Sequence, residues 1–159
     1  MDDAHKQAAI GALNQILELE LAGVVKYTHY GLMVYGYNRI PIVSWFNGTG
    51  QIASLIGVIL LPFYAERVGK KVTLLGGHPS LKIGALLETH EHDIGAILRE
   101  SLNHEQDALN AYNALLAVAE GHSVLLEEFA REMIVAAEMH LDEVNKMLRR
   151  PGETAAFTA

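Results

Sequence analysis

The stretch LNQILELELAGVVKYTHY, residues 13–30, decides the fold that we expect for this chain. Residues that would share one face of a helix recur within this stretch, and just before it, at steps of three and four residues. The stripe consists of Ile10, Leu13, Leu17, Glu20, Val24 and Tyr27. That spacing is the period of an amphipathic α-helix. Glu20 is the charged member of a stripe that is otherwise suited to a protein core.

Three further segments carry the same period, so the sequence predicts four long helices. We expect them at residues 3–35, 51–75, from 86 or 89 to 120, and 124–150. Pro41 and the Asn47-Gly48-Thr49-Gly50 cluster interrupt the pattern, which predicts a crossing loop at residues 37–50. The fold class is therefore all-α, a four-helix bundle over residues 1–150 with a short tail at 151–159.

The connections predict how the helices follow one another. Gly76-Gly77-His78-Pro79 is a helix stop, and Ser123 is a good N-cap for the last helix. We expect a long connection of about ten residues between the second and third helices, and a turn of two or three before the fourth. Short connections make sequential helices antiparallel.

Composition excludes several classes of function. The chain has 159 residues and a net charge of −7, which argues against nucleic acid as a partner. It contains no cysteine, so disulfides and thiolate zinc sites are excluded. Its longest apolar run, residues 52–63, is shorter than the roughly 20 residues that span a bilayer. The acidic N-terminus lacks an export signal, so we expect a cytoplasmic protein that does not act at a membrane.

Three polar residues stand where the helical period calls for core residues: Glu20, Glu105 and His140, on three different helices. A buried carboxylate without a partner costs several kcal/mol. The three could satisfy one another by binding a cation, because bundles house metal centres on side chains that project inward. Imidazole and carboxylate together suit iron, zinc or manganese. A carboxylate at the wet edge of its stripe and a hydrogen-bonded core histidine remain the alternatives.

The sequence resembles the bacterioferritin branch of the ferritin superfamily over nearly its whole length. LNQILELELAGVVKYTHY is similar to the helix that bears that family's first iron-binding glutamate, which falls on Glu20, with a supporting tyrosine at Tyr27. In LRESLNHEQDALNAY, residues 98–112, the family's second such glutamate falls on Glu105. In AAEMHLDEVNKML, residues 136–148, the family's histidine falls on His140. The resemblance thus selects the same three residues as the helical period.

The chain also departs from that family. The resemblance calls for a Glu-x-x-His motif on the second and on the fourth helix. The second-helix pair falls on Leu61 and Tyr64, and the fourth-helix glutamate falls on Ala137. Glu138 does not replace it, because two residues before His140 lies about 200° around the helix. Both metal-bridging carboxylates are missing, and Tyr64 is left as a supporting residue that packs or offers a phenolate.

The resemblance implies an iron-binding or iron-storage protein with an incomplete di-iron centre, holding one iron ion per chain or another divalent metal. The family's activity is ferroxidase, oxidation of Fe(II) to Fe(III) with O₂, but without bridging carboxylates we leave open whether this chain is an enzyme. The family's haem-ligating methionine falls on Pro62, so we do not expect haem. The resemblance also implies a homo-oligomer, from a dimer to a cage. Two alternatives stay open: a non-catalytic structural subunit, and a bundle oxidase or small-molecule binder with a single metal.

Other histidines are weaker candidates. Thr89-His90-Glu91-His92 places two imidazoles two residues apart, on different sides of a helix, which is typical of a solvated helix start. His104 lies about 100° from the stripe that contains Glu105, so we expect it to be exposed or at an interface.

Overall fold

The computed structural model describes residues 1–46 and 60–158, and these residues form helices and connections without any strand. The helices are α1 (Asp3–Met33), α2 (Arg39–Phe46), α3 (Leu60–Leu74), α4 (Ile94–Ala119) and α5 (Val124–Leu148). The predicted all-α class is confirmed. Two features of the prediction, the start of the second long helix at residue 51 and the Asn47–Gly50 cluster, lie outside the described residues.

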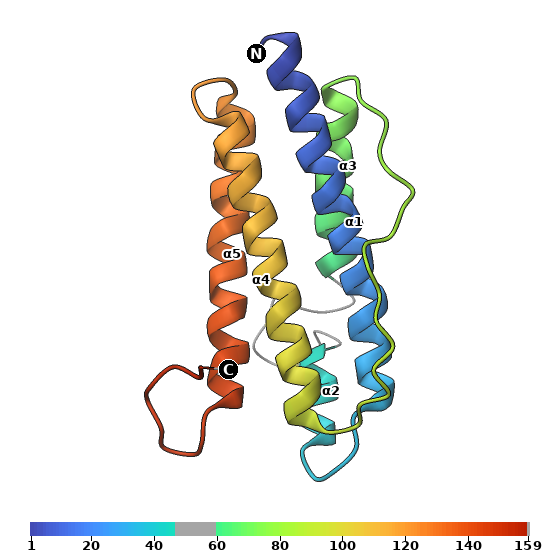
Figure 1. Cartoon of the computed structure of the whole chain (residues 1–159), viewed down its shortest axis with the longest axis vertical. Helices are drawn as coiled ribbons and strands as arrows, with labels where there is room; N and C mark the ends of the chain where they lie inside the picture. The colour runs from blue at the N-terminus through green and yellow to red at the C-terminus, as the bar shows by residue number, and fades with distance from the viewer. Residues whose placement is uncertain (47–59, 159) are drawn as a thin grey trace.

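The long helices form a bundle in which α1 packs against both α3 and α4, and α4 packs against α5. In Figure 1, α1 descends, α3 and α4 rise, and α5 descends again. Each packed pair is therefore antiparallel. The helices α3 and α4 run in the same direction, because the connection between them, residues 75–93, returns along the whole length of the bundle (Figure 1). This connection, called the crossover below, is the predicted long connection.

The crossover is held to the outer side of α1. Asn14 donates to the carbonyl oxygen of His78 over 3.1 Å and accepts from the backbone N–H of Ser80 over 2.8 Å. Farther along, the N–H of Gly84 donates to the carbonyl oxygen of Glu18 over 2.9 Å. A Cβ at Gly84 would stand 3.1 Å from that oxygen, so only glycine allows the approach without a shift.

Several helix ends lie where the sequence predicts them. The helix α3 ends at Leu74, and Gly76 follows with a φ of 75°, the left-handed conformation expected of a C-terminal cap. The hydroxyl of Ser123 accepts from the N–H of Leu126 at the start of α5, as predicted for an N-cap.

Two predicted boundaries are wrong. Residues 39–46 form the short helix α2 rather than a loop. Pro41 falls in the first turn of α2, where a backbone N–H makes no hydrogen bond within the helix, so a proline is tolerated there. The third long helix begins at Ile94, not at residue 86 or 89. The side chain of Asp93 caps it by accepting from the N–H of Ala96 over 2.9 Å, and His90 has a φ of 54°, which interrupts any earlier helix.

The core consists of two apolar clusters with a polar layer between them. One cluster joins the N-terminal part of α1 to α3, to the C-terminal part of α4 and to the N-terminal part of α5. The other joins the C-terminal part of α1 to α2, to the N-terminal part of α4 and to the C-terminal part of α5. Four buried polar side chains lie at mid-height: Glu20, His104, Glu105 and His140. The fold thus places ionisable groups at the centre of the bundle, where water is excluded.

Among the described residues, α1 is the helix long and apolar enough to cross a membrane by length and composition alone. Core helices of bundles pass the same test. Here α1 is covered on its inner side by α3 and α4 and on its outer side by the crossover.

Candidate metal centre

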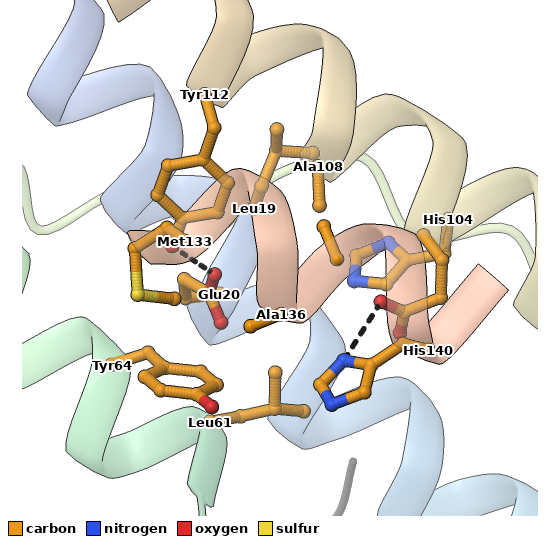
Figure 2. A pocket seen from close by; sticks show the side chains of 12 residues that line it. Leu19, Glu20, Leu61, Tyr64, His104, Ala108, Tyr112, Met133, Ala136 and His140 are labelled. Carbon is orange, nitrogen blue, oxygen red and sulfur yellow. Dashed lines mark hydrogen bonds and ion pairs between the residues drawn. The ribbon is translucent and has the colours of Figure 1, made fainter. Parts of the chain in front are cut away.

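The polar layer surrounds a small cavity that all four long helices line. Figure 2 shows Glu20 from α1, Tyr64 from α3, His104 from α4 and His140 from α5 around it. The cavity has a volume of about 20 Å³. This is room for one water-sized particle, since a single water needs at least about 10–15 Å³. The cavity, as these residues line it, is suited to one ion or one water and is too small for an organic ligand.

Glu105 is held between two partners. The hydroxyl of Tyr27 donates to its Oε1, and Nδ1 of His140 lies 3.6 Å from its Oε2, within ion-pair range. Burial alone would raise the pKa of Glu105. The imidazole of His140 and the hydroxyl of Tyr27 outweigh burial, and the net pKa of this carboxyl is lowered. Glu105 is therefore a buried carboxylate that stays ionised near neutral pH.

Glu20 is in a different electrostatic state. It is 4% exposed, and its Oε1 accepts a 2.6 Å hydrogen bond from the hydroxyl of Tyr112. Burial raises the pKa of Glu20 to about 8, and the nearby charge of Glu105 adds to the rise, although Tyr112 opposes it. Without a cation, Glu20 is therefore mostly protonated at pH 7, and the centre carries one carboxylate charge instead of two.

The two glutamates and two tyrosines form a reciprocal pattern across α1 and α4. Tyr27 lies seven residues after Glu20, and Tyr112 lies seven residues after Glu105. Seven residues are two helical turns, so each pair shares one face of its helix. Because the helices are antiparallel, each tyrosine reaches the glutamate of the other helix. Both phenols have a pKa raised well above 10 by burial, which keeps them as donors.

The three positions at which the resemblance calls for the missing ligands do face the cavity. Leu61, Tyr64 and Ala137 all line it, and they offer no carboxylate or imidazole there. Glu138 is exposed on α5 and does not contribute. Tyr64, predicted as a supporting residue, is a buried lining residue beside Leu61 (Figure 2), and burial raises the pKa of its phenol.

The predicted ligands come to one place without forming a finished metal site. As the side chains lie, no three His, Asp or Glu residues within 1–46 and 60–158 stand close enough together to hold an ion. The structure brings Glu105 and His140 together, whereas Glu20 stands across the cavity with Tyr112. Within the described part of the chain, Oε2 of Glu20 and Nε2 of His140 are buried and have no hydrogen-bond partner. Unpartnered polar atoms of this kind around a cavity fit a cation.

Two residues of the centre escaped the sequence prediction. His104 is 4% exposed and lines the cavity, so the expectation of an exposed histidine is wrong. It is buried because Gly23 on α1 leaves room for its ring, and burial lowers its pKa. Tyr112 is a core residue by helical period, but the period does not assign it to the site. The equal Glu-to-Tyr spacing on the two helices is the signal that could have identified it.

The histidines of the crossover lie elsewhere. Thr89-His90-Glu91-His92 does not start a helix, which corrects the prediction, although His90 and His92 are exposed as expected. His29 and His90 each approach the carboxylate of Glu88, at 3.5 and 3.6 Å. The contact of His29 links α1 to the crossover at the surface, whereas His90 and Glu88 both belong to the crossover.

Comparison with known proteins agrees with this architecture. None of the curated proteins compared with the chain matches it. A ferritin-like diiron-carboxylate protein from Bacillus anthracis str. Ames is similar in structure, with a TM-score of 0.82 and 19% identity over 94% of this chain and 100% of that one. A dodecameric thioferritin from Bacteroides fragilis, described as bacterioferritin-related, has a TM-score of 0.76 and 18% identity over 90% and 85% of the two chains.

A bacterioferritin from Desulfovibrio desulfuricans has a TM-score of 0.71 and 21% identity over 91% of this chain and 80% of that one. Likenesses at these identities establish the fold. Independently, a family model described as a ferritin-like domain matches residues 59–151, more than half of the chain. The chain therefore belongs to the ferritin-like family.

Proposed function

We propose that this chain is an iron-binding protein whose centre takes one metal ion, held by Glu105 and His140 with Glu20 approaching from the other side of the cavity. The observation that carries the proposal is the pair of unpartnered buried atoms, Oε2 of Glu20 and Nε2 of His140, on one cavity of about 20 Å³. A buried polar atom without a partner costs about 1–3 kcal/mol, which a bound cation would offset.

The donor set supports iron or a similar divalent metal. One ionised carboxylate, one imidazole and a second carboxyl are ligands that iron, zinc and manganese all accept. Glu20 would lose its proton as the cation arrives, because a nearby positive charge lowers the pKa of a carboxyl.

The missing bridges argue against a complete di-iron centre. Leu61 and Ala137 occupy the two positions where bridging carboxylates would stand, and the cavity has room for about one particle. A single Fe(II) supplies one electron to an oxidant, whereas ferroxidase chemistry draws on a bridged pair. We therefore propose binding or storage without rapid ferroxidase activity.

A structural subunit is the second candidate, and one observation favours it. Glu20 and Glu105 already have tyrosine partners, and the pKa of about 8 leaves Glu20 neutral when no ion is present. The metal-free centre is thus tolerable within the bundle, and the chain could serve to build an assembly.

Anaerobic Fe(II) titration of chelator-treated protein, followed by metal analysis and O₂ uptake, separates these functions. We expect one iron per chain and slow O₂ consumption. Two irons per chain with rapid O₂ consumption would contradict the incomplete centre. Absence of bound metal, together with unchanged stability in Glu20→Ala and His140→Ala variants, would establish the structural subunit instead.

We further propose that the chain works as a homo-oligomer in the cytoplasm. The crossover carries apolar side chains that are largely open to solvent, with Leu81 94% and Leu87 79% exposed. Clustered apolar surface of this kind usually marks an interface. The Bacteroides fragilis structure, similar in fold, is described as dodecameric.

A further inference from the structure

His104 occupies the same cavity as the proposed ligands, although the resemblance assigns it no role. It precedes Glu105 on α4, and its ring meets the ring of Tyr27 edge-on at 5.9 Å. Figure 2 shows His104 and His140 on the same side of the cavity, with Glu20 opposite. Two imidazoles and the ionised carboxylate of Glu105 thus gather at one end of the cavity.

The unpartnered buried atoms converge on this cavity. Across residues 1–46 and 60–158, three buried side-chain nitrogen or oxygen atoms lack a hydrogen-bond partner: Oε2 of Glu20, Nδ1 of His104 and Nε2 of His140. All three residues line the one cavity. Unpaired buried polar atoms are rare in folded proteins and call for an explanation. A single shared cation would partner all of them.

Gly23 leaves the space that the ring of His104 occupies. A Cβ at Gly23 would stand 2.8 Å from Nε2 of His104, closer than real side chains approach. Movement is needed, because no three candidate ligands in the described ranges are close enough to hold an ion as they lie. Nδ1 of His104 has no hydrogen-bond partner, so turning the ring about the Cβ–Cγ bond to bring a nitrogen toward Glu105 breaks no hydrogen bond of this atom.

We propose that His104 is a ligand of the single metal ion, which His104, His140 and Glu105 hold with two imidazoles and one carboxylate. This ligand set is typical of mononuclear non-haem Fe(II) sites with open positions. The inference rests on the proposed function, because it adds a ligand to the same centre. The imidazole of His104 takes the place of a ligand that α3, with Leu61 and Tyr64, does not provide.

Pulsed electron paramagnetic resonance of the Cu(II)-loaded protein tests the ligand set by counting the imidazoles coupled to the ion. His122→Ala serves as the background for every sample, since the stacked rings of His5 and His122, 3.6 Å apart, could capture the probe ion. We expect two coupled imidazoles in this parent, one in His104→Gln, one in His140→Gln, and two in the exposed control His78→Gln.

Zn²⁺ affinity, measured by calorimetry on the same proteins, gives an independent readout. Loss of a direct ligand should weaken binding more than about tenfold in His104→Gln, the lower end of the effect known even for residues behind a ligand. His78→Gln should bind as the parent does. Circular dichroism melting checks that each variant is folded, and His104→Asn provides a second variant.

The outcomes separate this inference from the proposed function. Failure of the parent to bind any ion overturns both. One bound ion with a single coupled imidazole in the parent, or equal Zn²⁺ affinity in folded His104→Gln, overturns the role of His104 and leaves the proposed function standing. If neither His104 variant folds, the imidazole count of the parent decides alone.

Discussion

At the scale of single residues, the centre combines two carboxyls that the fold treats differently. Glu105 stays ionised because His140 and Tyr27 contact it, whereas Glu20 has one tyrosine donor and a buried free oxygen. Desolvation penalises the charged form of both. The balance of contacts, rather than burial alone, therefore decides which carboxyl carries the charge.

This difference predicts how the stability of the metal-free protein depends on pH. The pKa of Glu20 is about 8 in the folded state and near 4.5 when unfolded, so the folded state binds more protons between these values. The contribution of Glu20 to stability is then fully present below about pH 4.5 and is lost as pH rises through 8. At 1.36 kcal/mol per pKa unit, the difference between about 8 and 4.5 makes the total loss about 5 kcal/mol.

Urea unfolding of chelator-treated protein at pH 5 to 8 measures this effect, with Glu20→Gln as the comparison. In Glu20→Gln, the decline in the free energy of unfolding with rising pH should be absent. This variant should also be more stable than the parent at pH 8. His104 opposes the trend, because its lowered pKa reduces stability as pH falls below 6.5, but it is present in both proteins and cancels in their difference. Equal pH profiles in the two proteins would refute the prediction.

The sequence identified some residues of the centre and missed others, for reasons of geometry. Glu20, Glu105 and His140 stand on core stripes, where helical period alone predicts that they face inward. His104 lies off its stripe and is buried through Gly23, a gap in a neighbouring helix that no periodicity within α4 reveals. Contacts between helices can be read only after the helices are placed.

At the scale of elements, the crossover determines how the bundle is wound. It follows α1 from Asn14 to Met33, whose carbonyl oxygen lies 2.8 Å from Nδ1 of His92. This course returns the chain to the far end of the bundle and makes α3 and α4 parallel. The sequence predicted the connection but underestimated it, because its apolar residues look like the beginning of a helix.

Asn14 provides a test of this attachment. In Asn14→Ala the carbonyl oxygen of His78 and the N–H of Ser80 each lose a partner. At about 0.5–1.5 kcal/mol per hydrogen bond, we expect a loss of about 1–2 kcal/mol in the free energy of unfolding. Amide hydrogen exchange should accelerate over residues 78–84 in particular.

Asn113→Ala is the matched control, since the side chain of Asn113 is exposed and donates to the carbonyl oxygen of Leu109 within its own helix, α4. It should change stability by less than about 0.5 kcal/mol. Unchanged exchange in the crossover of Asn14→Ala would mean that other contacts, such as Ser80 with Glu18, hold the segment alone.

At the scale of the whole molecule, the exposed side of the crossover predicts self-association. Native mass spectrometry of the parent should show an oligomer, and the double variant Leu81→Lys, Leu87→Lys should shift it toward monomer, because two charges would be buried at the contact. The control is Val135→Lys, Met139→Lys, a comparably exposed apolar pair on α5. A monomeric parent, or dissociation by the control alone, would contradict the proposed interface.

The reciprocal pairing of Glu20 with Tyr112 and of Glu105 with Tyr27 has a consequence for how the centre can change over time. A glutamate with a tyrosine partner in its own chain keeps a hydrogen bond when no ion is bound, so the fold tolerates it without metal. A carboxylate at position 61 or 137 would have the ion as its main partner and would destabilise the fold once ion binding weakens. The carboxyls of the centre are therefore lost more readily from α3 and α5 than from α1 and α4.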